Sequence, residues 1–215
     1  TTEIYTLSLH DALPISLRPQ VSIPRRALGP LLMVTPVNIA TWMLGGFYLS
    51  LMPSMVANAT GLTSPFIGGS IVATLMLSAT AAIFLFRPLP PARALVIGTL
   101  MLIAGVSVTL TGLSLHSVAW LYLGTAIAGQ GFGSIFSSVL KIIMQLAESH
   151  ERAGLFSAFL IKSYLAFALP AIAAGMAAPH IGLNQTAWFY GMTIIVLALV
   201  SLLAIRGRAL AGAAS

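Results

Sequence analysis

The sequence predicts an all-α membrane protein that crosses the bilayer six times. Charged residues make up only 7% of the chain and hydrophobic residues 58%, whereas a soluble domain carries about 25% charged residues. The apolar residues gather in six runs, each close to the roughly 20 residues that a helix needs to cross the hydrocarbon core. Such a chain has too few polar groups to cover its surface in water, so we expect it to lie in a lipid bilayer.

The net charge of the chain and its distribution along the sequence limit the kinds of partner that the chain can bind. The formal net charge is +6, a value that on its own would suit nucleic-acid binding. The arginines, however, stand singly between long apolar runs and form no basic cluster, so we expect no nucleic-acid partner. The chain has no cysteine, which excludes disulfide bonds and thiol chemistry.

The first sixteen residues differ from the rest of the chain. Residues 1–16 read TTEIYTLSLHDALPIS and resemble the in-frame translation of a common short-read sequencing adapter. The alternative interpretation is a polar N-terminal tail. Non-native segments are left out of fold reasoning, so Glu148 and Glu151 are the only acidic residues counted as native. The adapter resemblance also leads us to expect a truncated gene product.

Six apolar windows define the predicted spans, and the breaks between them carry proline, glycine or charge, except the short break at 114–117, which carries two serines and a histidine. The spans are 31–56, 66–86, 94–113, 118–146, 155–177 and 186–205. The breaks between them lie at 58–65, 87–93, 114–117, 148–152 and 179–185. The predicted organisation is therefore an adapter-derived segment (1–16), a cytoplasmic linker (17–30), a six-helix bundle (31–208) and a cytoplasmic tail (209–215).

The positions of the arginines provide a check on the predicted number of six spans. With six spans, the following arginines all fall on one side of the membrane: Arg18, Arg25, Arg26, Arg87, Arg93, Arg152, Arg206 and Arg208. The loops on the other side contain no lysine or arginine. Because lysine and arginine concentrate in cytoplasmic loops, both termini are predicted to be cytoplasmic. The alanine-rich sequence is typical of a bacterial protein, so the expected location is the inner membrane.

The predicted fourth span carries a row of polar residues. At about 100° per residue, these share one side of a helix: Gln130, Ser134, Ser137, Lys141 and Gln145. The opposite side carries Phe132, Ile135, Phe136, Val139, Ile142 and Ile143. Lipid penalises polar side chains, so the row is predicted to face protein or water. It either lines a hydrated substrate cavity or forms a packing seam, and Gly129 and Gly133 at GxxxG spacing support the second alternative.

The first span shows a similar division. Asn38, Thr41 and Trp42 share one side of the predicted helix with Gly45. An amide and an indole suit a solute that needs a hydrogen bond and a flat apolar contact. The alternative is ordinary bonding between helices and an interfacial aromatic residue, although Trp42 lies deeper than an interfacial belt.

The fifth span places a lysine within the membrane. A charged side chain there costs about 2.5–3.5 kcal/mol on insertion scales, so Lys162 is predicted to have a partner, a water-filled space or a route to the surface. No acidic residue lies in any span. Its counter-ion is then a substrate, a carboxylate of a missing segment, or backbone carbonyls. Lys141 lies nearer the cytoplasmic edge, where it can extend to the interface.

The pattern of spans resembles one half of a major facilitator superfamily transporter. Polar rows mark the first, second, fourth and fifth spans, while the third and sixth carry none. The run from Gly124 to Gly133 resembles the family's tenth helix, and the segment from Glu151 to Ala158 resembles its loop into helix eleven. The 87–93 loop keeps only two arginines of the loop motif found there. The resemblance covers residues 24–208 and matches these spans to helices seven to twelve.

This resemblance implies a fold of two inverted three-helix repeats, with helices three and six of the bundle at its periphery. It implies secondary active transport of a small solute, coupled to protons or another ion, by this bundle together with a missing N-terminal half. The expected substrate-cavity residues are Asn38, Thr41, Trp42, Gln130, Ser134, Ser137, Lys141 and Lys162. A chain that supplies one bundle is not expected to transport alone.

Other functions fit the sequence less well. An intramembrane protease needs a serine with a histidine or lysine partner at depth, but His116 and His180 both lie in loops. A metal-dependent hydrolase needs paired histidines or carboxylates, which the spans lack. We therefore predict no enzymatic activity, no metal site and no cofactor. A membrane scaffold or receptor that transports nothing is the alternative.

Overall fold

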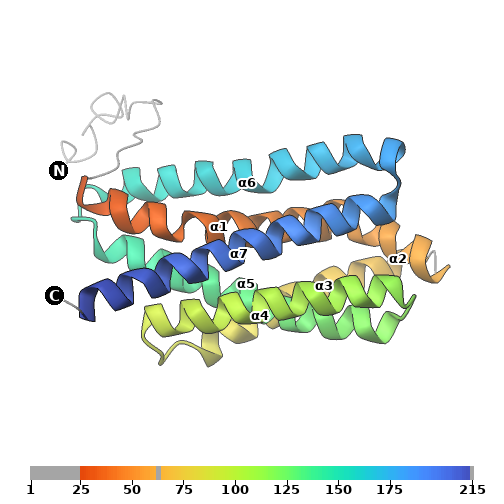
Figure 1. Cartoon of the computed structure of the whole chain (residues 1–215), viewed down its shortest axis with the longest axis horizontal. Coiled ribbons are helices and arrows are strands. Elements are labelled where there is room, and N and C mark those ends of the chain that lie inside the picture. The colour runs from red at the N-terminus through yellow and green to blue at the C-terminus, as the bar shows by residue number, and fades with distance from the viewer. Residues whose placement is uncertain (1–24, 62–63, 214–215) are drawn as a thin grey trace, which may run out of the picture.

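The apolar runs form helices throughout the part of the chain that the structure, a computed structural model, describes: residues 25–61 and 64–213. Within these residues the chain has seven helices and no strand (Figure 1). They are α1 (Arg25–Ser50), α2 (Met52–Thr60), α3 (Pro65–Leu85), α4 (Pro91–Ser114), α5 (Val118–Gln145), α6 (Arg152–Ile181) and α7 (Leu183–Ala213). All but α2 are long and apolar enough to cross a membrane. The predicted class, an all-α polytopic membrane protein, is confirmed.

The first predicted span divides into two helices at a proline. α1 ends at Ser50 and α2 begins at Met52, with Pro53 in its first turn. A proline has no backbone N–H, so the bond from residue 53 back to residue 49 is absent and the helix breaks there. α2 ends at Gly61, whose φ of 71° is the left-handed conformation that glycine adopts at little cost.

Each of the five predicted breaks falls at a connection between helices, but the last connection is shorter than predicted. The sequence predicted a connection over 179–185, but α6 continues through Pro179 to Ile181. Pro179 removes only one backbone donor, and the N–H of Gly182 still bonds the carbonyl of Ala178 at 3.0 Å. The helix ends at Gly182, whose φ is 86°, and α7 begins at the next residue.

The ends of the bundle also differ from the predicted boundaries. α1 begins at Arg25, inside the predicted linker, and α7 continues to Ala213, inside the predicted tail. The adapter-like segment and the linker up to residue 24 lie outside the described residues. So do the side chains of Arg25, Arg26, Arg206 and Arg208.

The helices pack in a pattern that repeats within the bundle. α1 packs against α6 and α7, and α5 packs against α3 and α4. α1 also contacts α5, and α4 contacts α7. Exchanging the group α1, α3, α4 with the group α5, α6, α7 leaves these contacts in place, although α6 also packs against α7 whereas the described residues of α3 and α4 make no comparable contact. Two spans, α3 and α4, lie between α1 and α5, so α1 and α5 run in opposite directions through the membrane, and so do the two groups. Figure 1 shows α6 on one side of the bundle, α3 to α5 on the other, and α1 and α7 between them.

Glycines let the helices around α5 approach closely. A Cβ atom added to Gly105 of α4 or Gly131 of α5 would come within 3.0 Å of backbone atoms of the other helix. Gly129 and Gly133 are equally close to the backbone of α3. The packing seam predicted from their GxxxG spacing is therefore present, and its partner is α3. In lipid, such close approach is a main source of helix association.

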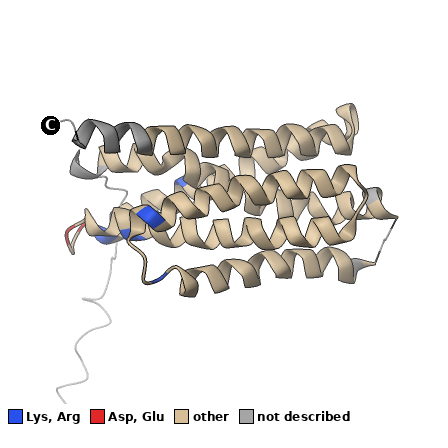
Figure 2. Ribbon diagram, turned by 60° about the horizontal axis from the view of Figure 1, so that its bottom comes forward, with Lys and Arg blue, Asp and Glu red and all other residues tan. Residues whose placement is uncertain are grey.

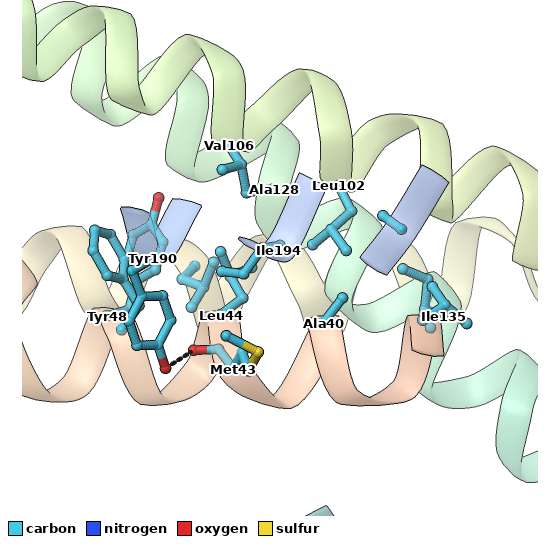
Figure 3. Packing of buried hydrophobic residues seen from close by; sticks show 14 of the residues in the cluster. Ala40, Met43, Leu44, Tyr48, Leu102, Val106, Ala128, Ile135, Tyr190 and Ile194 are labelled. Carbon is cyan, nitrogen blue, oxygen red and sulfur yellow. Dashed lines mark hydrogen bonds between the residues drawn. The ribbon is translucent and has the colours of Figure 1, made fainter. Parts of the chain in front are cut away.

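Tyrosine hydroxyls connect the core across the bundle. The buried Tyr48 hydroxyl of α1 lies 3.1 Å from Thr109 Oγ1 of α4 and 2.9 Å from Thr125 Oγ1 of α5. The hydroxyl of Tyr190 donates to the Met43 carbonyl oxygen at 2.9 Å, as Figure 3 shows. Each bond joins α1 to another helix, so α1 occupies the centre of the fold.

Apart from Lys162, the described charges gather at one end of the bundle (Figure 2). Arg87 precedes α4, Arg93 lies in its first turn, and Arg152 begins α6, so the α3–α4 and α5–α6 connections carry them. The described arginines therefore share one end, as six spans require.

Candidate functional site

The polar residues of α1 are bonded within the bundle. Asn38 is buried, and its Nδ2 donates to Ser163 Oγ of α6 at 3.0 Å. Thr41 is also buried, and its hydroxyl donates to the carbonyl oxygen of Val37, one turn earlier, at 2.7 Å. The structure thus gives Asn38 the bond between helices that was the alternative to substrate contact, and it gives Thr41 a bond within its own helix.

Trp42 lies half-buried in a group of aromatic rings from three helices. Its ring centroid is 5.2 Å from that of Tyr164 in α6 and 6.2 Å from that of Phe136 in α5, both edge-on. The indole Nε1 is buried and has no hydrogen-bond partner among the described residues. A buried indole N–H normally has an acceptor, because leaving a polar group unbonded away from water is costly. The indole N–H of Trp42 is therefore a buried donor without an acceptor among the described residues.

Lys162 lies on the same aromatic group, towards the arginine-bearing end. The ring of Phe159 lies 6.3 Å from that of Phe136 and 6.0 Å from Lys162 Nζ. Lys162 Nζ also donates to Thr35 Oγ1 of α1 at 3.0 Å. Among the described residues no carboxylate pairs with it, since Glu148 and Glu151 lie in the connection before α6. The ammonium thus has a hydroxyl and a ring face as partners, with no opposite charge.

The polar row of α5 divides into parts with different surroundings. Ser134 is buried, and its hydroxyl donates to the Ala94 carbonyl oxygen of α4 at 2.7 Å. Ser137 is half-buried and donates to the carbonyl oxygen of Ser134 at 3.2 Å. Gln130 is half-buried, whereas Lys141 and Gln145 are exposed. For Ser134 the structure contradicts the predicted cavity lining, because the serine packs in the seam between α4 and α5.

The polar row also faces away from the aromatic group. Gly129 and Gly133 mark the side of α5 against α3, and Gly131 marks the side against α4. Phe132 and Phe136 mark the side towards α1, where they meet Gly45 and Trp42. By helical periodicity, Gln130, Ser137 and Lys141 fall between the α3 and α4 sides, roughly opposite α1. The apolar side of α5 is the inner one, and Ile135, Val139 and Ile143 on it are fully buried.

The structure therefore assembles only part of the predicted site. Asn38, Trp42 and Lys162 come together between α1 and α6, and the α5 row lies apart from them. The sequence analysis missed Thr35, Ser163 and Tyr164. Thr35 had a detectable signal, because residues 35, 38 and 42 have the i, i+3, i+7 spacing of one helix face. Ser163 and Tyr164 had none, since their role depends on which face of α6 meets α1.

The side chains of this site are of kinds that bind small-molecule ligands. Its members are an ammonium, an indole N–H and the faces of several aromatic rings. Among the described residues, no three His, Cys, Asp or Glu side chains are grouped so that they could hold a metal ion. No protein-family model and no curated protein matches the chain.

Proposed function

We propose that this chain is a six-helix bundle of a secondary transporter of the major facilitator type, and that Trp42 and Lys162 contact its small-molecule solute. The observation that carries the proposal is the ammonium of Lys162 within a membrane-spanning helix, with no carboxylate partner among the described residues. A charge at that depth is expensive and marks a solute or ion pathway by default.

The arrangement of the helices supports the same proposal. The exchange of α1, α3 and α4 with α5, α6 and α7, in opposite directions, is the pattern of inverted repeats on which many transporters are built. Transporter sites lie near the bilayer midplane, where repeats or bundles meet. Trp42 and Lys162 lie on the two adjacent helices α1 and α6, within their spans. A second six-helix bundle would close the other side of the site.

Orientation and coupling form part of the proposal. The arginine-bearing end is cytoplasmic by the positive-inside rule, which places both termini in the cytoplasm of a bacterial inner membrane. An ion or proton gradient supplies the free energy of transport.

Alternating access gives a test that needs no known substrate. This chain has no native cysteine, so single cysteines can be placed in it within the complete transporter, after any cysteines of the second bundle have been replaced. A hydrophilic, membrane-impermeant thiol reagent is applied to intact cells and, separately, to inverted vesicles. Lys162→Cys and Trp42→Cys should react from both sides, because a transporter opens its site to each side in turn.

Two variants provide the controls. Val139→Cys is fully buried and should react from neither side, and Leu203→Cys is 69% exposed on α7 and should meet only lipid. Reaction of the site cysteines from one side only would indicate a fixed vestibule, as in a receptor. The absence of reaction from both sides would make the aromatic group a packing feature, and either result would reject the transporter proposal.

A further inference from the structure

A cavity lies at the arginine-bearing end of the bundle, between the last turn of α5 and the start of α6. It has a volume of about 380 Å³ and is lined by Lys141, Met144, Gln145 and Arg152. We propose that this cavity binds the phosphate group of an anionic phospholipid. Arg152 lies ten residues before Lys162 on α6, roughly 15 Å along a helix, so this site is separate from the proposed solute site and does not depend on it.

The lining has the chemistry of a phosphate site. Two helices supply one cation each, Gln145 adds amide donors, and no acidic side chain lines the cavity. The Nε of Arg152 donates to the Ala147 carbonyl oxygen at 3.4 Å. That bond orients the guanidinium and leaves its terminal nitrogens available to hold two phosphate oxygens together.

The nearby acids have other contacts. Glu151 Oε2 accepts a bond from the backbone N–H of Glu148 at 3.0 Å. The Glu148 carboxylate lies 3.7 Å from His150 Nδ1. Both interactions lie within the α5–α6 connection, and neither carboxylate lines the cavity.

The depth of the cavity favours a lipid as the source of the phosphate. The apolar span of α5 ends at Gln145 and that of α6 begins at Arg152, so the cavity lies where hydrocarbon gives way to headgroups. Basic pockets between transmembrane helices at the cytoplasmic surface bind anionic headgroups. Met144 in the lining and Phe156, 38% exposed one turn further along α6, offer apolar surface to an acyl chain.

The test measures lipid retention by the purified chain. The chain is placed in phosphatidylcholine nanodiscs that contain a small fraction of phosphatidylglycerol, and the lipids that remain bound are counted by native mass spectrometry. Phosphatidylglycerol should be enriched over phosphatidylcholine. The double variant Lys141→Gln, Arg152→Gln should bind it roughly ten- to thirty-fold more weakly, because each cation near the membrane surface contributes about a fivefold factor.

Control variants separate a site from general surface charge. Arg93→Gln removes an exposed arginine in the first turn of α4, at the same end, and should leave retention unchanged. The variant Lys141→Arg, Arg152→Lys keeps both charges and should retain the lipid, which guards against a misfolded double variant. Equal loss in Arg93→Gln, or equal retention of both lipids, would overturn the proposal. So would full displacement of phosphatidylglycerol by millimolar inorganic phosphate, because the cavity would then be a soluble-anion site.

Discussion

Asn38 of α1 donates a hydrogen bond to Ser163 of α6 at 3.0 Å, and both side chains are buried. This bond fixes the two helices that carry Trp42 and Lys162 relative to each other. Hydrogen bonds between helices in membranes contribute about 0.6 kcal/mol on average, because the separated helices find other partners.

Asn38 and Ser163 should therefore be energetically coupled. Asn38→Ala and Ser163→Ala should each lower the free energy of unfolding, and the double variant should lose less than the sum, with a coupling of about 0.6–1.7 kcal/mol. Unfolding in mixed micelles measures each value. Thr41→Val, which breaks only a bond within α1, should show no coupling to Ser163→Ala. Strict additivity for Asn38 and Ser163 would mean that the bond contributes nothing to the packing of α1 on α6.

Replacing Lys162 with an apolar residue should stabilise the bundle. Lys162→Met keeps the length of the side chain and removes an ammonium that has no opposite charge among the described residues. The unfolding free energy should rise by roughly 1–2 kcal/mol, since the bonds to Thr35 and Phe159 offset only part of the cost of the charge. The melting temperature in a single detergent reports the change.

Lys141→Met is the matched control for this substitution. Lys141 is exposed near the end of α5, so its replacement should change stability by less than about 0.5 kcal/mol. A fall in the melting temperature of Lys162→Met would mean that the lysine is a structural residue. The expected gain in stability, accompanied by lost function, is the trade-off typical of binding sites.

Gly105 should tolerate no side chain. A Cβ atom there would come within 3.0 Å of backbone atoms of Ala128, which cannot move without separating α4 from α5. Gly105→Ala should cost about 4 kcal/mol or more, which is the range for severe overpacking. Gly175→Ala in α6 has nothing within 4 Å of the new methyl group and should raise stability by up to about 1 kcal/mol. Size-exclusion profiles after heating compare the two variants, and similar profiles would contradict the close approach of α4 and α5.

Reporter fusions test the topology. Positions in the three connections at the end without arginine should lie outside the cell, and those at the arginine-bearing end should be cytoplasmic. The outer positions are Asn58, His116 and Gly182, and the cytoplasmic ones are Pro90, His150 and Arg208. Alkaline phosphatase is active only outside and green fluorescent protein only inside, so the two reporters give opposite signals. One fusion on the wrong side would refute six spans.

The spans were predictable because hydropathy and charge act on each segment separately. The breaks at residues 58–65, 87–93, 114–117 and 148–152 follow from local composition alone. The predicted connection over 179–185 contains the observed break at Gly182 but is longer than it, because α6 continues through Pro179. A proline removes a single backbone hydrogen bond. The tight turn at Gly182 then joins α6 to α7 with one residue between them.

The site was harder to predict, because helical periodicity gives the face of a residue and says nothing of the neighbour that the face meets. The predicted face of α1 includes Asn38, which meets Ser163 of α6, and Trp42, which meets Tyr164 of α6. The polar row of α5 was predicted either to line a cavity or to form a packing seam; glycines on either side of it bring α3 and α4 close, and Ser134 bonds to α4. Which helices approach each other depends on packing among segments far apart in the sequence.

Crosslinking can test this division of the predicted site directly. Trp42 and Tyr164 meet between α1 and α6, with ring centroids 5.2 Å apart. Gln130 lies on the side of α5 that faces away from α1. In the cysteine-free chain, the pair Trp42→Cys, Tyr164→Cys should therefore react with a short bifunctional maleimide, and the pair Trp42→Cys, Gln130→Cys should not.

A protease site inserted between α3 and α4 makes the crosslink visible, because residue 42 then lies on one fragment and residues 130 and 164 on the other. After cleavage, a crosslinked chain migrates as one band on a denaturing gel and an uncrosslinked chain as two. The Gln130 pair serves as the matched control, since it contains the same Trp42→Cys substitution. A crosslink to Gln130 without one to Tyr164 would place the polar row of α5 beside Trp42. The proposed solute site would then lie between α1 and α5.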